Sequence, residues 1–218
     1  MSTDSVENKR YKIISLLYIV FICFAIVKIN ISVLDSNIYT IKTFQKIYNE
    51  DQIKIETNKL KILEHMNYIK SNSKSLVFFN ISNRLNKSTI IIDDIIKNVN
   101  FQFNKNNTSL IEEFNKDKLI ENILDNHFGI KKLQSELFNL SNYINNAEYR
   151  LNISLDSLVP ISDQILNLAG NPESFEDYLF KRKPTAISYL QLERIKFILS
   201  HTQLLYQEAA LNEINLIY

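Results

Sequence analysis

The sequence predicts an all-α protein, in which a single N-terminal transmembrane helix precedes a periplasmic antiparallel helical bundle. Three observations lead to this fold class. The 218 residues contain only 2 glycines and 3 prolines, fewer than the turns of an all-β domain require. Apolar residues recur every three to four positions, which is the spacing of one face of an α-helix. One long apolar segment, residues 13–34, lies near the N-terminus behind a basic flank.

The apolar segment 13–34 has the length of a membrane span. Its charge-free part, residues 13–27, gives only about 22 Å of helix at roughly 1.5 Å per residue, short of a hydrocarbon core of about 30 Å. Extension to Leu34 gives about 33 Å, and Lys28 is then a membrane-end anchor whose amine reaches the far interface. The predicted organisation is a cytoplasmic N-terminus over 1–12, a transmembrane helix over 13–34 and a periplasmic domain over 35–218.

Basic residues beside the span predict its orientation. Lys9, Arg10 and Lys12 precede the apolar run, and the positive-inside rule keeps them in the cytoplasm. We therefore expect a single-pass membrane protein whose main domain is exported. A cleaved signal peptide is the alternative, but no small-residue cleavage site follows the run.

The first predicted helices of the exported domain are long and separated by short turns. Residues 35–69 continue the membrane helix, because neither proline nor glycine interrupts them. The polar residues 71–75 predict the first turn. A second helix is predicted over 76–99, and residues 104–107 predict a loop.

A third helix is predicted to begin near Ser109 and to run to about His127. Thr108 and Ser109 are alternative N-caps, and only Ser109 with Glu112 has the form of a capping box. Gly129 is expected to end this helix, since glycine is favoured just after a helix C-terminus.

The clearest helix is predicted over residues 131–155. Its apolar stripe consists of Leu133, Leu137, Leu140, Ile144, Ala147 and Leu151. Residues 160–172, which contain two prolines and a glycine, predict a connection. A short helix over 173–180 and a final helix from Pro184 to Ile217 complete the prediction.

No group of residues predicts catalysis, so we expect that the protein is not an enzyme and needs no cofactor or metal. The histidines lie too far apart for metal-ligand spacing, at His65, His127 and His201. The carboxylate pairs Asp93–Asp94 and Glu112–Glu113 are expected on solvated helix faces. A net charge of +1 argues against nucleic acid as a partner.

Two segments carry a pattern that resembles a known family. The first is RYKIISLLYIVFI, residues 10–22, and the second is FKRKPTAISYLQL, residues 180–192. The first is similar to the N-terminal Arg-x-Lys-Met-Ile-Asn-x-Met-Tyr-Leu-Val segment of the GldM/PorM family of type IX secretion and gliding motility. The second resembles the last helix of that family's first periplasmic domain, which a proline opens.

The resemblance implies a motor subunit of the bacterial inner membrane. Such proteins form a dimer whose membrane helices sit inside a ring of a multi-span GldL/PorL-like partner, and proton flow through the ring drives mechanical motion. Arg10 matches a family arginine that is associated with a glutamate of the partner. Arg10, Lys12 and Tyr18 are thereby the predicted partner-contact and proton-coupling residues; alternatively, Arg10 is only a positive-inside anchor.

The chain also departs from the family. Residues 60–171 show no similarity to it, and the β domains that follow the helical domain in the family have no counterpart before Tyr218. The alternative function is a membrane-anchored periplasmic helical sensor or scaffold with no motor role. A eukaryotic signal-anchored protein is a third possibility, for which Asn80 and Asn152 would be glycosylation acceptors.

Overall fold

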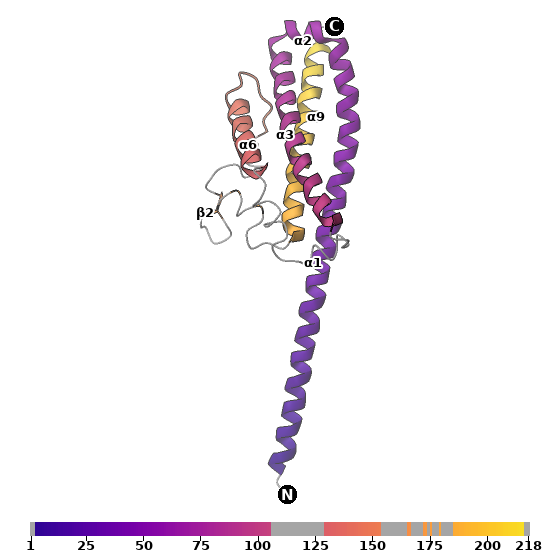
Figure 1. Cartoon of the computed structure of the whole chain (residues 1–218), viewed down its shortest axis with the longest axis vertical. Coiled ribbons are helices and arrows are strands. Elements are labelled where there is room, and N and C mark those ends of the chain that lie inside the picture. The colour runs from indigo at the N-terminus through magenta and orange to yellow at the C-terminus, as the bar shows by residue number, and fades with distance from the viewer. Residues whose placement is uncertain are drawn as a thin grey trace. The chain divides into compact units, whose positions relative to one another are not determined.

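A computed structural model describes residues 3–105, 129–153, 165–166, 172–173, 175, 179 and 185–215. The prediction of an all-α protein is confirmed, because five helices make up most of these residues (Figure 1). The β structure among them is one antiparallel pair of two-residue strands, β1 (Ile165–Leu166) and β2 (Pro172–Glu173).

The chain divides into two compact units between Tyr39 and Thr40. The sequence had placed a boundary between Leu34 and Asp35. Helix α1 (Thr3–Glu64) runs through both positions as one element of 62 residues, which accords with the absence of proline and glycine from this stretch. The described part of unit 1, residues 3–39, is all helix, and unit 2 contains every other element.

The predicted membrane location is wrong. Within the part of the chain that the structure describes, no helix combines the length and apolar character needed to cross a bilayer. This finding overturns the single-pass location in a bacterial inner membrane, with a cytoplasmic N-terminus and a periplasmic main domain. The physical reason is visible in the sequence, because the charge-free run ends at Val27 after about 22 Å of helix, and Lys28, Asn30 and Ser32 follow it.

The predicted continuation of the first helix to residue 69 is interrupted once. Helix α1 ends at Glu64, His65 forms a turn, and α2 (Met66–Ser71) follows. The chain then reverses at Asn72, whose side-chain Oδ1 accepts a hydrogen bond of 3.0 Å from the backbone N–H of Ser75. This bond caps the start of α3 (Ser73–Lys105), so the predicted turn over 71–75 is confined to one residue.

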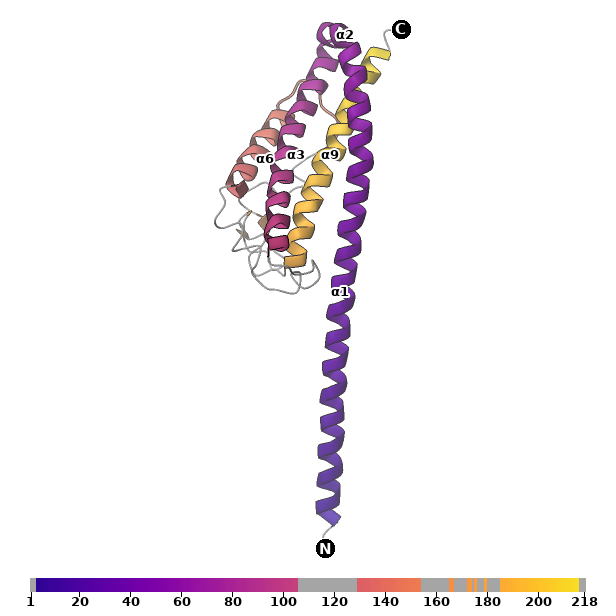
Figure 2. The ribbon, with the colours of Figure 1, turned by 45° about the vertical axis from the view of Figure 1, so that its right-hand side comes forward.

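Helices α1 and α9 (Thr185–Asn215) run parallel within unit 2. Gln45 is hydrogen-bonded to Glu193 and Gln52 to Ser200, and both pairs are 148 positions apart. A constant separation in sequence requires that the two helices run in the same direction. Helix α9 lies between α1 and α3 in Figure 2, and in Figure 1 it does so in the upper part, below which α3 crosses α9.

Helices α3 and α9 run antiparallel and approach each other closely. The start of α3 contacts the end of α9, where the Ser75 hydroxyl donates a hydrogen bond of 2.5 Å to the backbone carbonyl of Ala210. Near the other end of α3, Asn100 accepts a hydrogen bond from the Tyr189 hydroxyl. The α3–α9 interface is the most extensive contact between described elements.

Helix α6 (Gly129–Asn145) covers the other side of α3 and confirms the start of the predicted 131–155 stripe. Four residues of that stripe are buried, namely Leu133, Leu137, Leu140 and Ile144. The helix ends ten residues earlier than predicted, where the Arg150 guanidinium donates to the backbone carbonyl of Asn145. Gly129 begins this helix, and the predicted helix before it lies outside the described residues.

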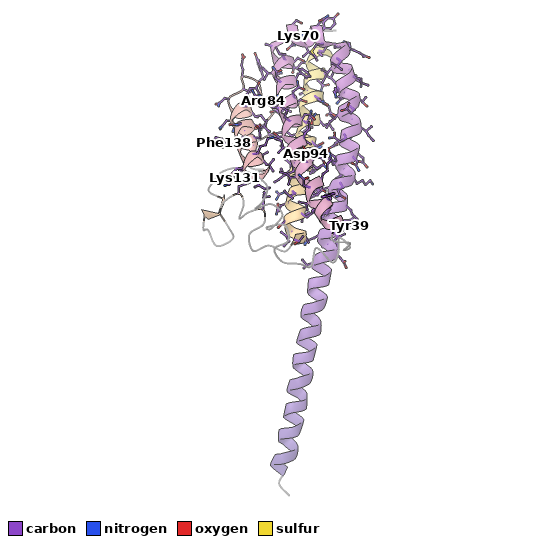
Figure 3. The ribbon with its side chains drawn as sticks, in the orientation of Figure 1. Tyr39, Lys70, Arg84, Asp94, Lys131 and Phe138 are labelled. Carbon is purple, nitrogen blue, oxygen red and sulfur yellow. The ribbon has the colours of Figure 1, made fainter. Side chains whose placement is uncertain are left out.

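A cation–π contact joins α6 to α3. The Arg84 guanidinium of α3 lies 3.8 Å from the ring centroid of Tyr143 on α6. Figure 3 labels Arg84, and also Phe138, an exposed residue of α6. The final helix, predicted from Pro184 to Ile217, is confirmed as α9, whereas the predicted short helix over 173–180 lies mostly outside the described residues.

Candidate functional site

Helix α9 carries a stripe of polar residues at heptad spacing that faces the interior of unit 2. The stripe consists of Glu193, Lys196, Ser200, Gln203 and Gln207, and all five are buried. The side chains of α9 that are exposed lie on another stripe, at Arg194, His201, Glu208 and Asn212. A helix with so narrow an exposed face is surrounded by other elements on most sides.

Helix α1 presents a matching stripe to α9. Its members also alternate three and four positions apart, at Gln45, Tyr48, Gln52, Ile55 and Lys59. Three of these residues contact their α9 counterparts at the same separation of 148 positions that the two hydrogen bonds show. We call the ten residues of the two stripes the polar seam.

An ion pair at the seam joins α9 to α3. The Lys196 Nζ lies 2.6 Å from Asp93 Oδ1, and Lys97 Nζ lies 2.7 Å from Asp93 Oδ2. Burial by itself raises the pKa of Asp93, but the hydrogen bonds and charges of the two lysines outweigh it and hold that pKa below its ordinary value. Asp93 and the neighbouring Asp94 were both predicted on solvated faces; Asp94 is exposed as predicted, whereas Asp93 is half-buried and paired with two lysines.

Tyr48 lies against the same ion pair. The Lys196 ammonium is 4.0 Å from the centroid of the Tyr48 ring, which is cation–π geometry. Burial raises the pKa of Tyr48 to about 12, and the negative charges of Asp93 and Glu193 act in the same direction. The phenol is neutral over the whole physiological range.

Glu193 is the carboxylate of the seam, and 2% of its surface is exposed. Its Oε1 accepts a hydrogen bond of 2.7 Å from the Gln45 side-chain amide. Burial, followed by the charge of Glu193, raises the pKa of the nearby Tyr189 far above its ordinary value. The Tyr189 hydroxyl donates a hydrogen bond to Asn100 of α3, so the pairing extends to all three helices.

A second paired carboxylate, Asp51, lies beside the seam. Asp51 of α1 is buried, and its Oδ2 is 3.0 Å from Nδ1 of His201, whose side chain is 47% exposed. The His201 ring stacks on Phe197, and Phe197 stacks on Phe44 of α1. This group is a further polar link between α1 and α9.

The three carboxylates of this region each have a separate partner. Asp93 and Asp51 each have a basic partner, and Glu193 accepts from an amide, so the three carboxylates form no shared acid–base site. Ser200 is adjacent to His201 in sequence. Adjacent residues on a helix do not face each other, so Ser200 does not extend the Asp51–His201 pair into a catalytic triad. No metal-binding group of His, Cys, Asp and Glu occurs among the described residues.

The predicted site residues lie elsewhere in the chain. Arg10, Lys12, Tyr18 and Lys28 belong to α1 in unit 1, and their side chains lie outside the described set. No role was predicted for the residues of the seam, and Asp93, which pairs with Lys196, was expected on a solvated helix face. The available signal was the heptad spacing of polar residues on α9 together with the same spacing on α1.

No protein family model, curated protein or solved structure matches this chain. The resemblance to the GldM/PorM family therefore rests on residues 10–22 and 180–192 alone. The polar seam lies outside the first segment and begins at the end of the second on α9.

Proposed function

We propose that this chain is a non-enzymatic subunit of a protein assembly. In this proposal, unit 2 is a helical scaffold that has the form of the predicted antiparallel bundle. The helix of unit 1 binds a partner protein. The particular form that the family resemblance implies is a motor subunit of the type IX secretion or gliding kind, which acts as a dimer with a GldL/PorL-like ring.

The register between α1 and α9 is the observation that carries this proposal. A shift of α1 by one seam position separates Gln45 from Glu193 and Gln52 from Ser200, and leaves buried polar groups without partners. Buried polar residues at heptad positions are a well-attested means of specifying helix register. Because these hydrogen bonds fix the register of α1 against α9, α1 keeps its axial position and its rotation when a force acts on its unit 1 part.

The unit 1 part of α1 supplies the binding element. The sequence of residues 13–27 is apolar and without charge, and a single helix has no core in which to bury such residues. A partner protein that surrounds this stretch would remove the apolar surface from water. Arg10, at its edge, is then placed to pair with an acidic group of the partner, and Tyr18 to contact the partner's helices.

The experiment that tests the proposal is site-specific photocrosslinking in the full chain. A photoreactive phenylalanine derivative replaces Tyr18, during co-expression with the GldL/PorL-like protein that the resemblance implies. The matched control carries the same group at Tyr68, an exposed residue of α2 in unit 2. We expect a discrete crosslinked product from position 18 and none from position 68.

Two outcomes contradict parts of the proposal. Crosslinks from position 18 to a different protein would keep the assembly role and reject the motor form. A chain that yields no crosslink from position 18, while it is expressed and folded, would reject the binding role of unit 1.

A further inference from the structure

A small cavity lies among α1, α3 and α9 at the part of the seam farthest from Gln45. It has a volume of about 120 Å³, and its walls include Ile55, Lys59, Phe79, Asn83, Gln203 and Gln207. Three helices thus contribute to it, and its wall combines apolar side chains with four carboxamides, since Asn86 also lines it.

Gln203 and Gln207 are the unusual residues of this cavity. Each is only 4% exposed, and neither side-chain Oε1 accepts a hydrogen bond from any residue that the structure describes. Buried side-chain acceptors nearly always have a partner, so each exception requires an explanation. The torsion that orients a glutamine carboxamide is broad, so rotation about it can turn each oxygen toward the cavity.

The register of α1 against α9 explains why these two acceptors lack partners. The separation of 148 positions that pairs Gln45 with Glu193 places Ile55 and Lys59 beside the two glutamines. Ile55 offers no donor. Lys59 has a 57% exposed side chain and pairs with Glu56 at 3.4 Å, on the solvent side of the helix.

We propose that this cavity binds a small alkylammonium group. The ammonium N–H groups donate hydrogen bonds to the carbonyl oxygens of Gln203 and Gln207, and the alkyl stem packs on Ile55 and Phe79. Glu56 and Lys59 at the rim pair with each other, so the selectivity of the site rests on the two carbonyl oxygens. An anion is disfavoured, because the groups without partners are acceptors.

The size of the cavity limits the ligand. A volume of 120 Å³ corresponds to about four water molecules at roughly 30 Å³ each, which suits an ammonium nitrogen with about three or four carbons. Two sources have this chemistry: a free short-chain amine, and the end of a lysine side chain from another protein.

The test is isothermal titration of the full chain with n-butylammonium chloride. Tetramethylammonium, which has the charge without N–H donors, and n-butanol, which has the stem without the charge, serve as comparison ligands. We expect n-butylammonium to bind at least tenfold more tightly than either. Equal affinity for the three ligands, or no heat with n-butylammonium, overturns the proposal, and this series needs no variant.

A variant pair locates the site. Q203M with Q207M removes both acceptors at similar volume and is expected to weaken n-butylammonium binding at least tenfold. Q134M, on α6 and outside both the cavity and the seam, is the matched control and is expected to bind as the wild type does. Unchanged binding by the folded double variant would place the ligand elsewhere and overturn the proposal.

A capped lysine distinguishes the two sources. If N-acetyl-lysine amide binds as tightly as n-butylammonium, the cavity accepts the end of a lysine side chain. If it binds at least tenfold more weakly, the cavity accepts a free amine. This site is independent of the partner proposed for unit 1, so loss of the Tyr18 crosslink leaves the titration result unaffected.

Discussion

The Gln45 side-chain amide donates a hydrogen bond of 2.7 Å to Glu193, although the two residues are 148 positions apart in sequence. The same separation joins Gln52 to Ser200 over 2.8 Å, two turns further along both helices. Two parallel helices are thereby held in one register by polar side chains.

Of the two lysines that pair with Asp93, Lys196 is expected to contribute more to the stability of the fold than Lys97. Lys196→Met leaves a partly buried carboxylate with the exposed Lys97 as its remaining cation. We expect the free energy of unfolding to fall by about 2 kcal/mol, less than the ~3–5 kcal/mol of a fully buried pair, because Asp93 keeps some solvent. Urea unfolding measures the change. Lys97→Met is the control and should have a much smaller effect; an equal effect would contradict the assignment.

The pKa of Asp93 predicts how stability depends on acid. Its folded-state pKa is lowered, so its contribution is complete above the unfolded value of about 3.9 and is lost as the pH falls through the folded value. We expect Asp93→Asn to be less stable than the wild type at pH 6 and to approach it below about pH 3. Urea unfolding at both values checks this. A constant difference between the two proteins would contradict it.

Tyr48 is expected to resist ionisation in the folded protein. Its pKa of about 12 lies above the ordinary value of 10.0, so its phenol stays neutral at pH 11, where exposed tyrosines lose their protons. The ultraviolet phenolate absorbance of the wild type and of Tyr48→Phe should therefore be equal at pH 11 while both are folded. After denaturation the wild type should show one more phenolate. A difference before denaturation would mean that Tyr48 is not buried against Lys196.

The pair formed by Asp51 and His201 is expected to stabilise the contact between α1 and α9. His201→Ala removes the group that faces the buried Asp51 carboxylate at 3.0 Å. An unsatisfied buried acceptor costs about 1–3 kcal/mol, and we expect a loss of unfolding free energy in that range. Thermal and urea unfolding measure it. His65→Ala, at an exposed histidine in the turn after α1, is the control and should change little.

Ala210 is expected to tolerate no larger side chain. It is fully buried where α3 and α9 approach closely, and its carbonyl accepts a hydrogen bond from Ser75. Ala210→Leu should destabilise the protein by about 1–3 kcal/mol, because the added atoms force the two helices apart. Ala209→Leu, at the less buried neighbouring position, is the matched control. Equal stability of the two variants would contradict the close approach.

Several elements of the fold were predictable because their signals are local. The stripe from Leu133 to Ile144 has helical spacing within one segment, and Pro184 marks the start of α9 from the residue before it. The reversal of the chain at Asn72, by contrast, involves the capping bond of one residue. The polar stretch 71–75 predicts only the approximate position of this reversal.

The candidate site was not predictable in the same way. Asp93 and Asp94 are adjacent and alike in sequence, yet Asp93 pairs with Lys196 and Asp94 is exposed. The difference between the half-buried Asp93 and the exposed Asp94 depends on a helix about a hundred positions away. The same limit applies to Asp51, whose partner His201 lies in the last helix.

The sequence by itself determined the helical class of this protein, the spacing of its apolar stripes and the resemblance of residues 10–22 and 180–192 to the GldM/PorM family. Only the tertiary structure decided that the polar stripe of α9 is covered by α1, and that Gln203 and Gln207 have no partner there. The physical reason is range. Helix propensity and periodicity act over a few residues, whereas the fate of a buried polar group depends on which side chain, 148 positions away, the packing brings beside it.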